Sequence, residues 1–151
     1  MSIEIFRSEN AFTGVPQDQE IIQVLQKIIS KSINLKDYSI SINLVDDAAI
    51  QKINLQHRNK NAATDVLSFP LGNPVANLPF VELGDIWISL QTANKQAREI
   101  GHSLQEEFYR LLVHGYLHLI GYDHETGLQD ELEMKKMEDR CLGLVFEDKW
   151  D

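Results

Sequence analysis

The chain has 151 residues, a length that suits one domain with its own core, and its hydrophobic and charged fractions of 43% and 25% are ordinary for a globular protein. The first ten residues lack the apolar segment of a signal peptide, and no apolar run approaches the roughly 18 residues that cross a bilayer, so we expect a cytoplasmic protein with no membrane association. The single Cys141 excludes an internal disulfide, and the net charge of −9 argues against broad, unspecific attraction to nucleic acid.

The first part of the chain predicts alternating strands and helices. A short strand is expected at residues 3–6, followed by a helix at 16–33 that starts with a proline and carries one apolar stripe. The clearest strand is 38–45, where apolar and polar residues alternate. Asp46 then predicts the N-cap of a helix that runs to about Arg58.

The middle of the chain predicts two more strands and another helix. We expect a strand at residues 64–69, stopped by a proline, and an alternating strand at 84–90. The two prolines of residues 71–83 indicate a loop between these strands. The next helix is expected to begin at Ser89 or Thr92 and to end before a glycine.

The last third of the chain is dominated by helices. Ser103 and Glu106 form the Ser-x-x-Glu pattern of a capping box, and the leucine-rich segment behind it predicts a central, largely buried helix. Gly121 suits the left-handed residue that ends such a helix. A last amphipathic helix is expected from about residue 128 to 142. Residues 1–151 therefore predict a single α+β domain, in which helices pack on a small mixed sheet.

The buried helix carries the motif "HGYLHLIGYDHE", residues 114–125. His114 and His118 are four residues apart and therefore lie on one face of the helix. Gly121 breaks the helix and lets the chain bring His124 back toward them. Three imidazoles with one open position for water are typical of a catalytic zinc site. The alternative is that the three histidines are separate structural residues, two on a buried helix and one in a turn.

Residues near these histidines suggest supporting roles. Asp123 and Glu125 flank the third histidine, and a carboxylate there can accept the second ring N–H of a ligand histidine and fix its tautomer. Of the two remaining histidines, His102 is expected to be a solvated loop or capping residue. His57 stands beside Arg58 in a basic stretch with no acid, and its role stays open.

A general base is not evident beside the first histidine. Metal-dependent proteases with this histidine spacing place a glutamate directly after it, where this chain has Gly115. Glu107 is two helical turns away, roughly 10 Å along the axis, which is too far for direct action. Asp65 and Asp85 begin predicted strands and are candidates for a cleft, although turn or cap roles suit them too. Arg58 offers either a guanidinium that clamps a phosphate or a cation that suits a helix end.

Three segments together resemble a known family. The chain reads "NLQHRNKNAATDVLSFP", then "LGDIWIS", then "HGYLHLIGYDHE", and this combination closely resembles the YbeY family of bacterial endoribonucleases. The match runs from the strand at Tyr38 to the helix after Leu128. The resemblance implies a zincin-like α+β fold with one zinc ion, held by His114, His118 and His124.

The resemblance also implies a substrate and further functional residues. Arg58 is implied to be functionally required, and with His114 it is the residue expected to carry catalysis. Members of the family act on single-stranded RNA in maturation of the 3′ end of small-subunit ribosomal RNA and in ribosome quality control. Ribosomal RNA and ribosomal or assembly proteins are therefore the implied partners. Two departures, His57 where a tyrosine is common and Ala63 where a proline is common, affect the shape of the substrate groove.

These residues are compatible with three functions. The leading hypothesis is a zinc-dependent endoribonuclease in which water activated by the metal attacks a phosphodiester while Arg58 steadies the phosphate. A metalloprotease has the same type of site, and Gly115 argues against it. The third is a ribosome-assembly factor that binds RNA without cutting it and holds a structural zinc. Other divalent metals, such as nickel or manganese, stay open, as does the oligomeric state.

Overall fold

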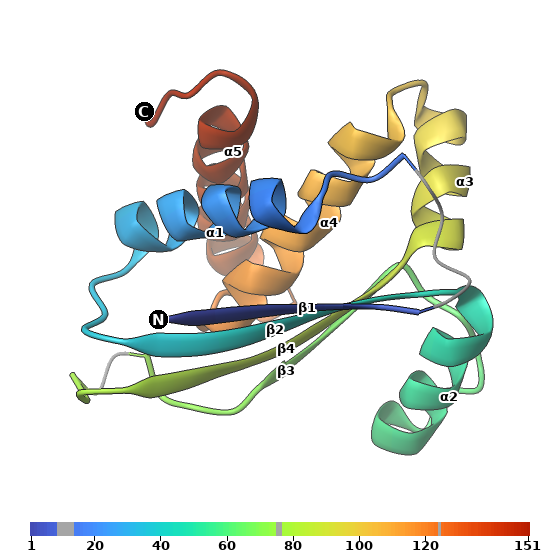
Figure 1. Ribbon diagram of the computed structural model, residues 1–151, viewed down its shortest axis with the longest axis horizontal. Helices are drawn as coiled ribbons and strands as arrows, with labels where there is room; N and C mark the ends of the chain where they lie inside the picture. The colour runs from blue at the N-terminus through green and yellow to red at the C-terminus, as the bar shows by residue number, and fades with distance from the viewer. Residues whose placement is uncertain (9–13, 75–76, 124) are drawn as a thin grey trace.

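The computed structural model describes residues 1–8, 14–74, 77–123 and 125–151 (Figure 1). Within these residues the chain forms four strands and five helices, which in chain order are β1 (Ser2–Arg7), α1 (Asp18–Ser32), β2 (Tyr38–Val45), α2 (Asp47–Arg58), β3 (Val66–Pro70), β4 (Val81–Ser89), α3 (Leu90–Ile100), α4 (Leu104–Leu119) and α5 (Leu128–Phe146). The strands form one sheet in the order β1-β2-β4-β3, in which β1, β2 and β4 are parallel and β3 is antiparallel to β4. The predicted α+β fold with a small mixed sheet is confirmed.

The two faces of the sheet carry different helices. Helices α1, α4 and α5 lie on one side of the sheet, and α2 lies on the other (Figure 1). Alternate residues of β2, including Ile40 and Ile42, belong to the large core under the first group of helices. A smaller cluster, centred on Ile50 and Leu67, joins α2 to the opposite face. Because strand side chains alternate between faces, the same strands supply both clusters.

Helix α4 begins and ends as the sequence predicts. Ser103 is its N-cap, and the Oγ atom accepts the backbone N–H of Glu106 at 3.1 Å. At the other end Gly121 has a left-handed φ of 108°, and the N–H of Tyr122 donates to the carbonyl of Leu117 at 3.0 Å. This is the hydrogen bonding of a Schellman ending. The helix that carries the histidine motif is therefore fixed at both ends.

Several element boundaries differ from the prediction. Strand β4 begins at Val81, so the predicted loop before it is shorter. The pairing of β4 with β2 skips from Glu82 to Gly84, and this bulge breaks the alternation that marks a strand in the sequence. Helix α1 begins at Asp18, which leaves the proline of the predicted first turn outside the helix. Helix α5 runs on to Phe146, beyond its predicted end.

Of the two predicted starts of α3, Ser89 and Thr92, the structure has the first. Ser89 is the N-cap, and its Oγ accepts the N–H of Thr92 at 3.3 Å. Gly101 ends the helix with a left-handed φ of 91°. In the part of the chain that the structure describes, no helix combines the length and apolar character required to cross a membrane.

Candidate active site

His114 and His118 form a converging pair on α4. Their Nε2 atoms are 3.1 Å apart, and their rings are nearly perpendicular, with an interplanar angle of 77°. Two nitrogens bound to one zinc ion at about 2.0–2.1 Å with tetrahedral angles lie about 3.3 Å from each other. The spacing therefore fits two ligands of one metal ion.

The third predicted ligand, His124, lies outside the described residues. Within residues 1–8, 14–74, 77–123 and 125–151, no group of three or more His, Cys, Asp or Glu side chains is arranged to hold a metal ion. The three-histidine ligand set therefore stays a prediction, and its two described members have the geometry that it requires.

A carboxylate from another helix orients His114. The Nδ1 atom of His114 lies 2.8 Å from Oε1 of Glu138 on α5. Because a carboxylate only accepts hydrogen bonds, the ring proton resides on Nδ1, and the Nε2 lone pair is directed at His118 and the space beside it. Glu138 is not among the predicted site residues. The available signal was an acid on the buried stripe of an amphipathic helix, between Met134, Met137 and Cys141.

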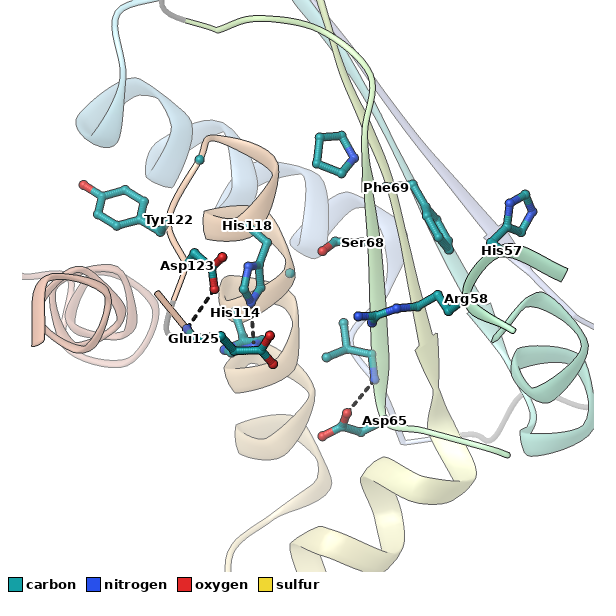
Figure 2. Close-up of a pocket in the computed structure, with 14 residues that line it drawn as sticks. His57, Arg58, Asp65, Ser68, Phe69, His114, His118, Tyr122, Asp123 and Glu125 are labelled. Atoms are coloured by element: carbon teal, nitrogen blue, oxygen red, sulfur yellow. Dashed lines mark hydrogen bonds between the residues drawn. The ribbon is translucent and has the colours of Figure 1, made fainter. Parts of the chain in front are cut away.

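The histidine pair opens into a cavity of about 590 Å³. The lining residues come from the end of α2, from β3 with the residue before it, and from α4 with the turn that follows: His57, Arg58, Asp65, Val66, Ser68, Phe69, Pro70, His114, Gly115, His118, Gly121, Tyr122, Asp123 and Glu125. Figure 2 shows the two histidines on one side of β3 and the end of α2 on the other. Strand β3, the edge of the sheet, therefore runs through the middle of the site.

Arg58 brings a cation to this cavity. It is the last residue of α2, and Asn59 ends the helix with a left-handed φ of 56°. The Arg58 side chain extends from the helix toward β3 (Figure 2). It is exposed, and within the described part of the chain its guanidinium has no hydrogen-bonding or ion-pairing partner. A guanidinium in this position is available to bind an anion that enters the cavity.

Gly115 sits where a protease of this motif has its glutamate. A Cβ atom built on Gly115 would lie 3.0 Å from Cγ2 of Ile86 and 3.2 Å from Cγ2 of Val66. The residue after the first histidine therefore faces the sheet, and even a methyl group there requires the neighbouring side chains to shift. The close approach of α4 to β3 and β4 explains why the position holds glycine and not a general base.

Glu107 belongs to a separate ionic cluster near the start of α4. Its side chain is fully buried, accepts two hydrogen bonds from Arg110 at 2.9 and 2.6 Å, and lies 2.9 Å from Nε2 of His102. The burial of Glu107 is compensated by these partners, which suits a structural role. His102 lies in the loop before α4, as predicted, but it is only partly solvated, because its side chain is 23% exposed and lies against the buried acid.

Of the two candidate aspartates, only one reaches the cavity. Asp85 hydrogen-bonds to Ser41 from the neighbouring strand and does not line the cavity. Asp65 does line it, and its Oδ1 atom accepts the backbone N–H of Val66 at 2.7 Å. Asp65 also accepts a bond from Gln96 at 3.3 Å, so it acts as a cap at the start of β3. Asp65 therefore lies at the cleft, as considered, and also has the cap role.

The exposed edge of β3 offers few backbone donors. Its antiparallel register with β4, and the bond from Ser89 N–H to the Asp65 carbonyl, direct the backbone groups of Val66 and Ser68 away from β4. The Val66 N–H is already bound by Asp65, and Pro70 has no N–H. Within β3, Ser68 N–H is therefore the donor left on the cavity side.

The fold resembles a solved structure. A solution structure of a protein from Thermotoga maritima superposes with a TM-score of 0.66 and covers 98% of this chain and 91% of that chain. The two sequences are 24% identical, so this likeness concerns the fold alone.

Sequence comparisons place the chain in a family. The family model described as Endoribonuclease YbeY matches residues 5–145. A relative from Leptospira biflexa, named Endoribonuclease YbeY, is 55% identical over 112 residues, which is 74% of this chain and 73% of the relative. A relative of the same name from Aquifex aeolicus is 41% identical over 121 residues, which is 80% of this chain and 79% of the relative. The chain therefore belongs to the YbeY family of endoribonucleases.

Proposed function

We propose that this protein is a metal-dependent endoribonuclease that cuts single-stranded RNA in ribosomal RNA maturation and ribosome quality control, as one domain over residues 1–151. The observation that carries the proposal is the convergence of His114 and His118, 3.1 Å apart, in a cavity that also receives the Arg58 side chain. Metal ligands and an open guanidinium in one cavity suit a phosphodiester substrate.

The proposed metal ligands are His114, His118 and His124, with one zinc ion per chain. Imidazole nitrogens suit zinc and also nickel. When bound, the ion would polarise a phosphoryl oxygen and acidify a water molecule. Glu138 holds the Nδ1 proton of His114 and so keeps the Nε2 lone pair available for the ion.

Arg58, from the α2 side of β3, and Ser68, on β3 itself, would bind the scissile phosphate. The guanidinium of Arg58 can donate two parallel hydrogen bonds to phosphate oxygens and can stabilise the charge that develops on them. Ser68 adds an outward backbone N–H and a hydroxyl on the cavity side. Both groups come from ordered elements, α2 and β3, so the phosphate would meet donors that are already in place.

The same geometry argues against a metalloprotease. Proteases often bind an extended peptide along a sheet edge, which requires a row of backbone donors and acceptors. The β3 edge lacks such a row of donors, because the Val66 N–H already donates to Asp65 and Pro70 has no N–H. In addition, the packing of Gly115 against Ile86 leaves no room for a glutamate base.

Partners and location follow from the proposed substrate. The net charge of −9 repels bulk RNA, so we expect ribosomal or assembly proteins to bring the enzyme to its cleavage site in the cytoplasm. A ribosome-assembly factor that binds RNA without cutting it is the alternative. The two differ in whether cleavage accompanies binding.

The test is cleavage of a single-stranded RNA by zinc-loaded protein, combined with elemental analysis. We expect about one metal ion per chain, less metal in His118→Ala, and a loss of kcat in Arg58→Ala of about 10²–10³-fold, with partial recovery in Arg58→Lys. Lys52→Ala, an exposed cation on the same helix outside the cavity, is the matched control and should keep full activity.

The alternatives predict other results. Binding of RNA by wild type and His118→Ala with equal affinity and no cleavage would support the assembly factor. Cleavage of unstructured casein without cleavage of RNA would support the protease. Metal-free protein with full RNA cleavage would contradict the proposed metal site.

A further inference from the structure

We propose that His57 and Phe69 form a stacking platform for one unpaired base of the RNA substrate, next to the phosphate that Arg58 binds. The proposal rests on the function proposed above and adds the part of the cavity that recognises a nucleobase. It assigns a role to His57, which the metal site and the phosphate contacts leave unused.

The two rings form a tilted pair at one end of the cavity. Their centroids are 5.1 Å apart, with an interplanar angle of 51°, and both residues line the cavity. Phe69 is half-buried and packs on the small cluster of Ile50 and Leu67 under α2, which holds its ring in place. His57 is exposed, and this anchored neighbour supports it from one side. An aromatic surface that is fixed on one side and open on the other can receive a base.

The position of Arg58 connects the platform to the reaction. His57 and Arg58 are consecutive residues in the last turn of α2, and Figure 2 shows Arg58 reaching from there toward β3. The platform lies on the α2 side of β3, whereas His114 and His118 lie on the other side. A base and its phosphate are joined through one sugar, so a base next to the phosphate that Arg58 binds would be able to reach the His57 ring.

A stacking platform explains selectivity for single strands without base-specific contacts. In a duplex each base is already stacked and paired, so stacking on protein requires that the base be free. Because every base has a face that can stack on a ring, the platform should tolerate all four bases. The enzyme would then select an unpaired nucleotide at that position, whichever base it carries.

The experiment pairs enzyme variants with abasic substrates. Single-stranded RNA oligonucleotides with one abasic nucleotide, placed in turn at each position around the cut, are compared with the intact RNA. For wild type, one abasic position should lower kcat/KM by roughly 5- to 150-fold. His57→Ala should show a similar loss on intact RNA, mainly through KM, and no further loss on that abasic RNA. His57→Tyr, which restores a ring, should recover most of the KM.

Two controls separate stacking from structural effects. Gln56→Ala, an exposed neighbour outside the cavity, should leave KM unchanged. Thermal unfolding of each variant shows whether loss of the His57–Phe69 contact alters the fold. If His57→Ala lowers kcat/KM equally on intact and on every abasic RNA, or if His57→Tyr is as defective as His57→Ala, the platform is overturned while the nuclease function stands.

A binding measurement tests the platform even if no RNA is cut. RNA with 2-aminopurine at successive positions is titrated with the His118→Ala variant and with the double variant that also carries His57→Ala. We expect fluorescence quenching at one position that disappears in the double variant. Quenching that is the same in both proteins would contradict the proposal whatever the outcome of the cleavage assay.

Discussion

The tautomer of His114 depends on a residue 24 positions further along the chain. The carboxylate of Glu138 accepts the Nδ1 proton of His114 at 2.8 Å, and both side chains are partly shielded, with exposures of 28% and 21%. A carboxylate in this position fixes the ring rotation and increases the basicity of the opposite nitrogen. Metal affinity should therefore depend on α5 as well as on the helix that carries the ligands.

Replacing Glu138 should weaken metal binding without removing a ligand. We expect Glu138→Ala to reduce zinc affinity by about 10–100-fold, because the His114 ring loses its orienting partner. Glu138→Gln keeps an acceptor and loses the charge, so its effect should be smaller. Competition with a chromophoric chelator measures the affinity. Glu131→Ala removes an exposed acid from the same helix and should bind zinc as wild type does, and an equal loss in both variants would contradict the orienting role.

Among the elements, α2 brings Arg58 to the site, so its attachment to the rest of the fold is important. It carries Arg58 and lies apart from the other helices, on the opposite face of the sheet (Figure 1). One carboxylate, that of Asp47, joins it to the start of α3 by accepting Ser89 Oγ at 2.5 Å and Thr92 Oγ1 at 2.6 Å. The side-chain oxygen of Gln91 also accepts the Asp47 N–H at 2.7 Å. The position of Arg58 thus depends on bonds at the far end of its helix.

Removal of the Asp47 bonds to α3 should make local opening of α2 more frequent than removal of its N-cap does. Asp47→Ala leaves two hydroxyls without their acceptor, and we expect a loss of about 1–3 kcal/mol in stability. Faster amide hydrogen exchange in α2 than in α4 would show that the opening is local. Asp46→Ala is the matched comparison, because Asp46 caps the same helix but makes no bond to α3. Uniform exchange throughout the protein in Asp47→Ala would contradict the local effect.

At the scale of the whole molecule, the large core contains ionisable groups that are kept neutral by burial. Burial raises the pKa of the Cys141 thiol to about 12, and it also raises the pKa of the Tyr109 and Tyr116 hydroxyls. The Tyr116 hydroxyl shares a hydrogen bond of 2.6 Å with Ser32 Oγ, which links α4 to α1. The packing of α1, α4 and α5 therefore depends on protons that alkaline solution removes.

Alkaline solution should destabilise the protein. The folded-state pKa of Cys141 lies above its ordinary value of 9.0, so the folded state holds this proton more tightly than the unfolded chain does. Stability should be complete below about pH 9 and should fall as the pH rises from there toward 12. Urea unfolding across this pH range measures the free energy of unfolding. In Cys141→Ala this free energy should depend less on pH, because only the tyrosines still contribute. A urea midpoint that stays constant above pH 9 would contradict this.

Features that depend on neighbouring residues could be predicted from the sequence. The N-cap Ser103 and the left-handed Gly121 define the ends of α4, because these signals act within one turn of helix. The spacing of His114 and His118 placed both rings on one face, since the helical repeat alone requires it. The family resemblance follows from the same local motifs, and the comparisons confirm it.

Features that depend on contacts between distant elements could not be predicted in this way. The fold brings Glu138 to His114 and Arg58 to the β3 edge, because the packing of α5 on α4 and of α2 on the sheet is not encoded in any local pattern. The close approach of Ile86 also explains why residue 115 is a glycine. In the sequence this position is visible only as the absence of a glutamate. Local motifs thus specify the two histidines on α4. The packing of separate elements brings Glu138 and Arg58 to these histidines.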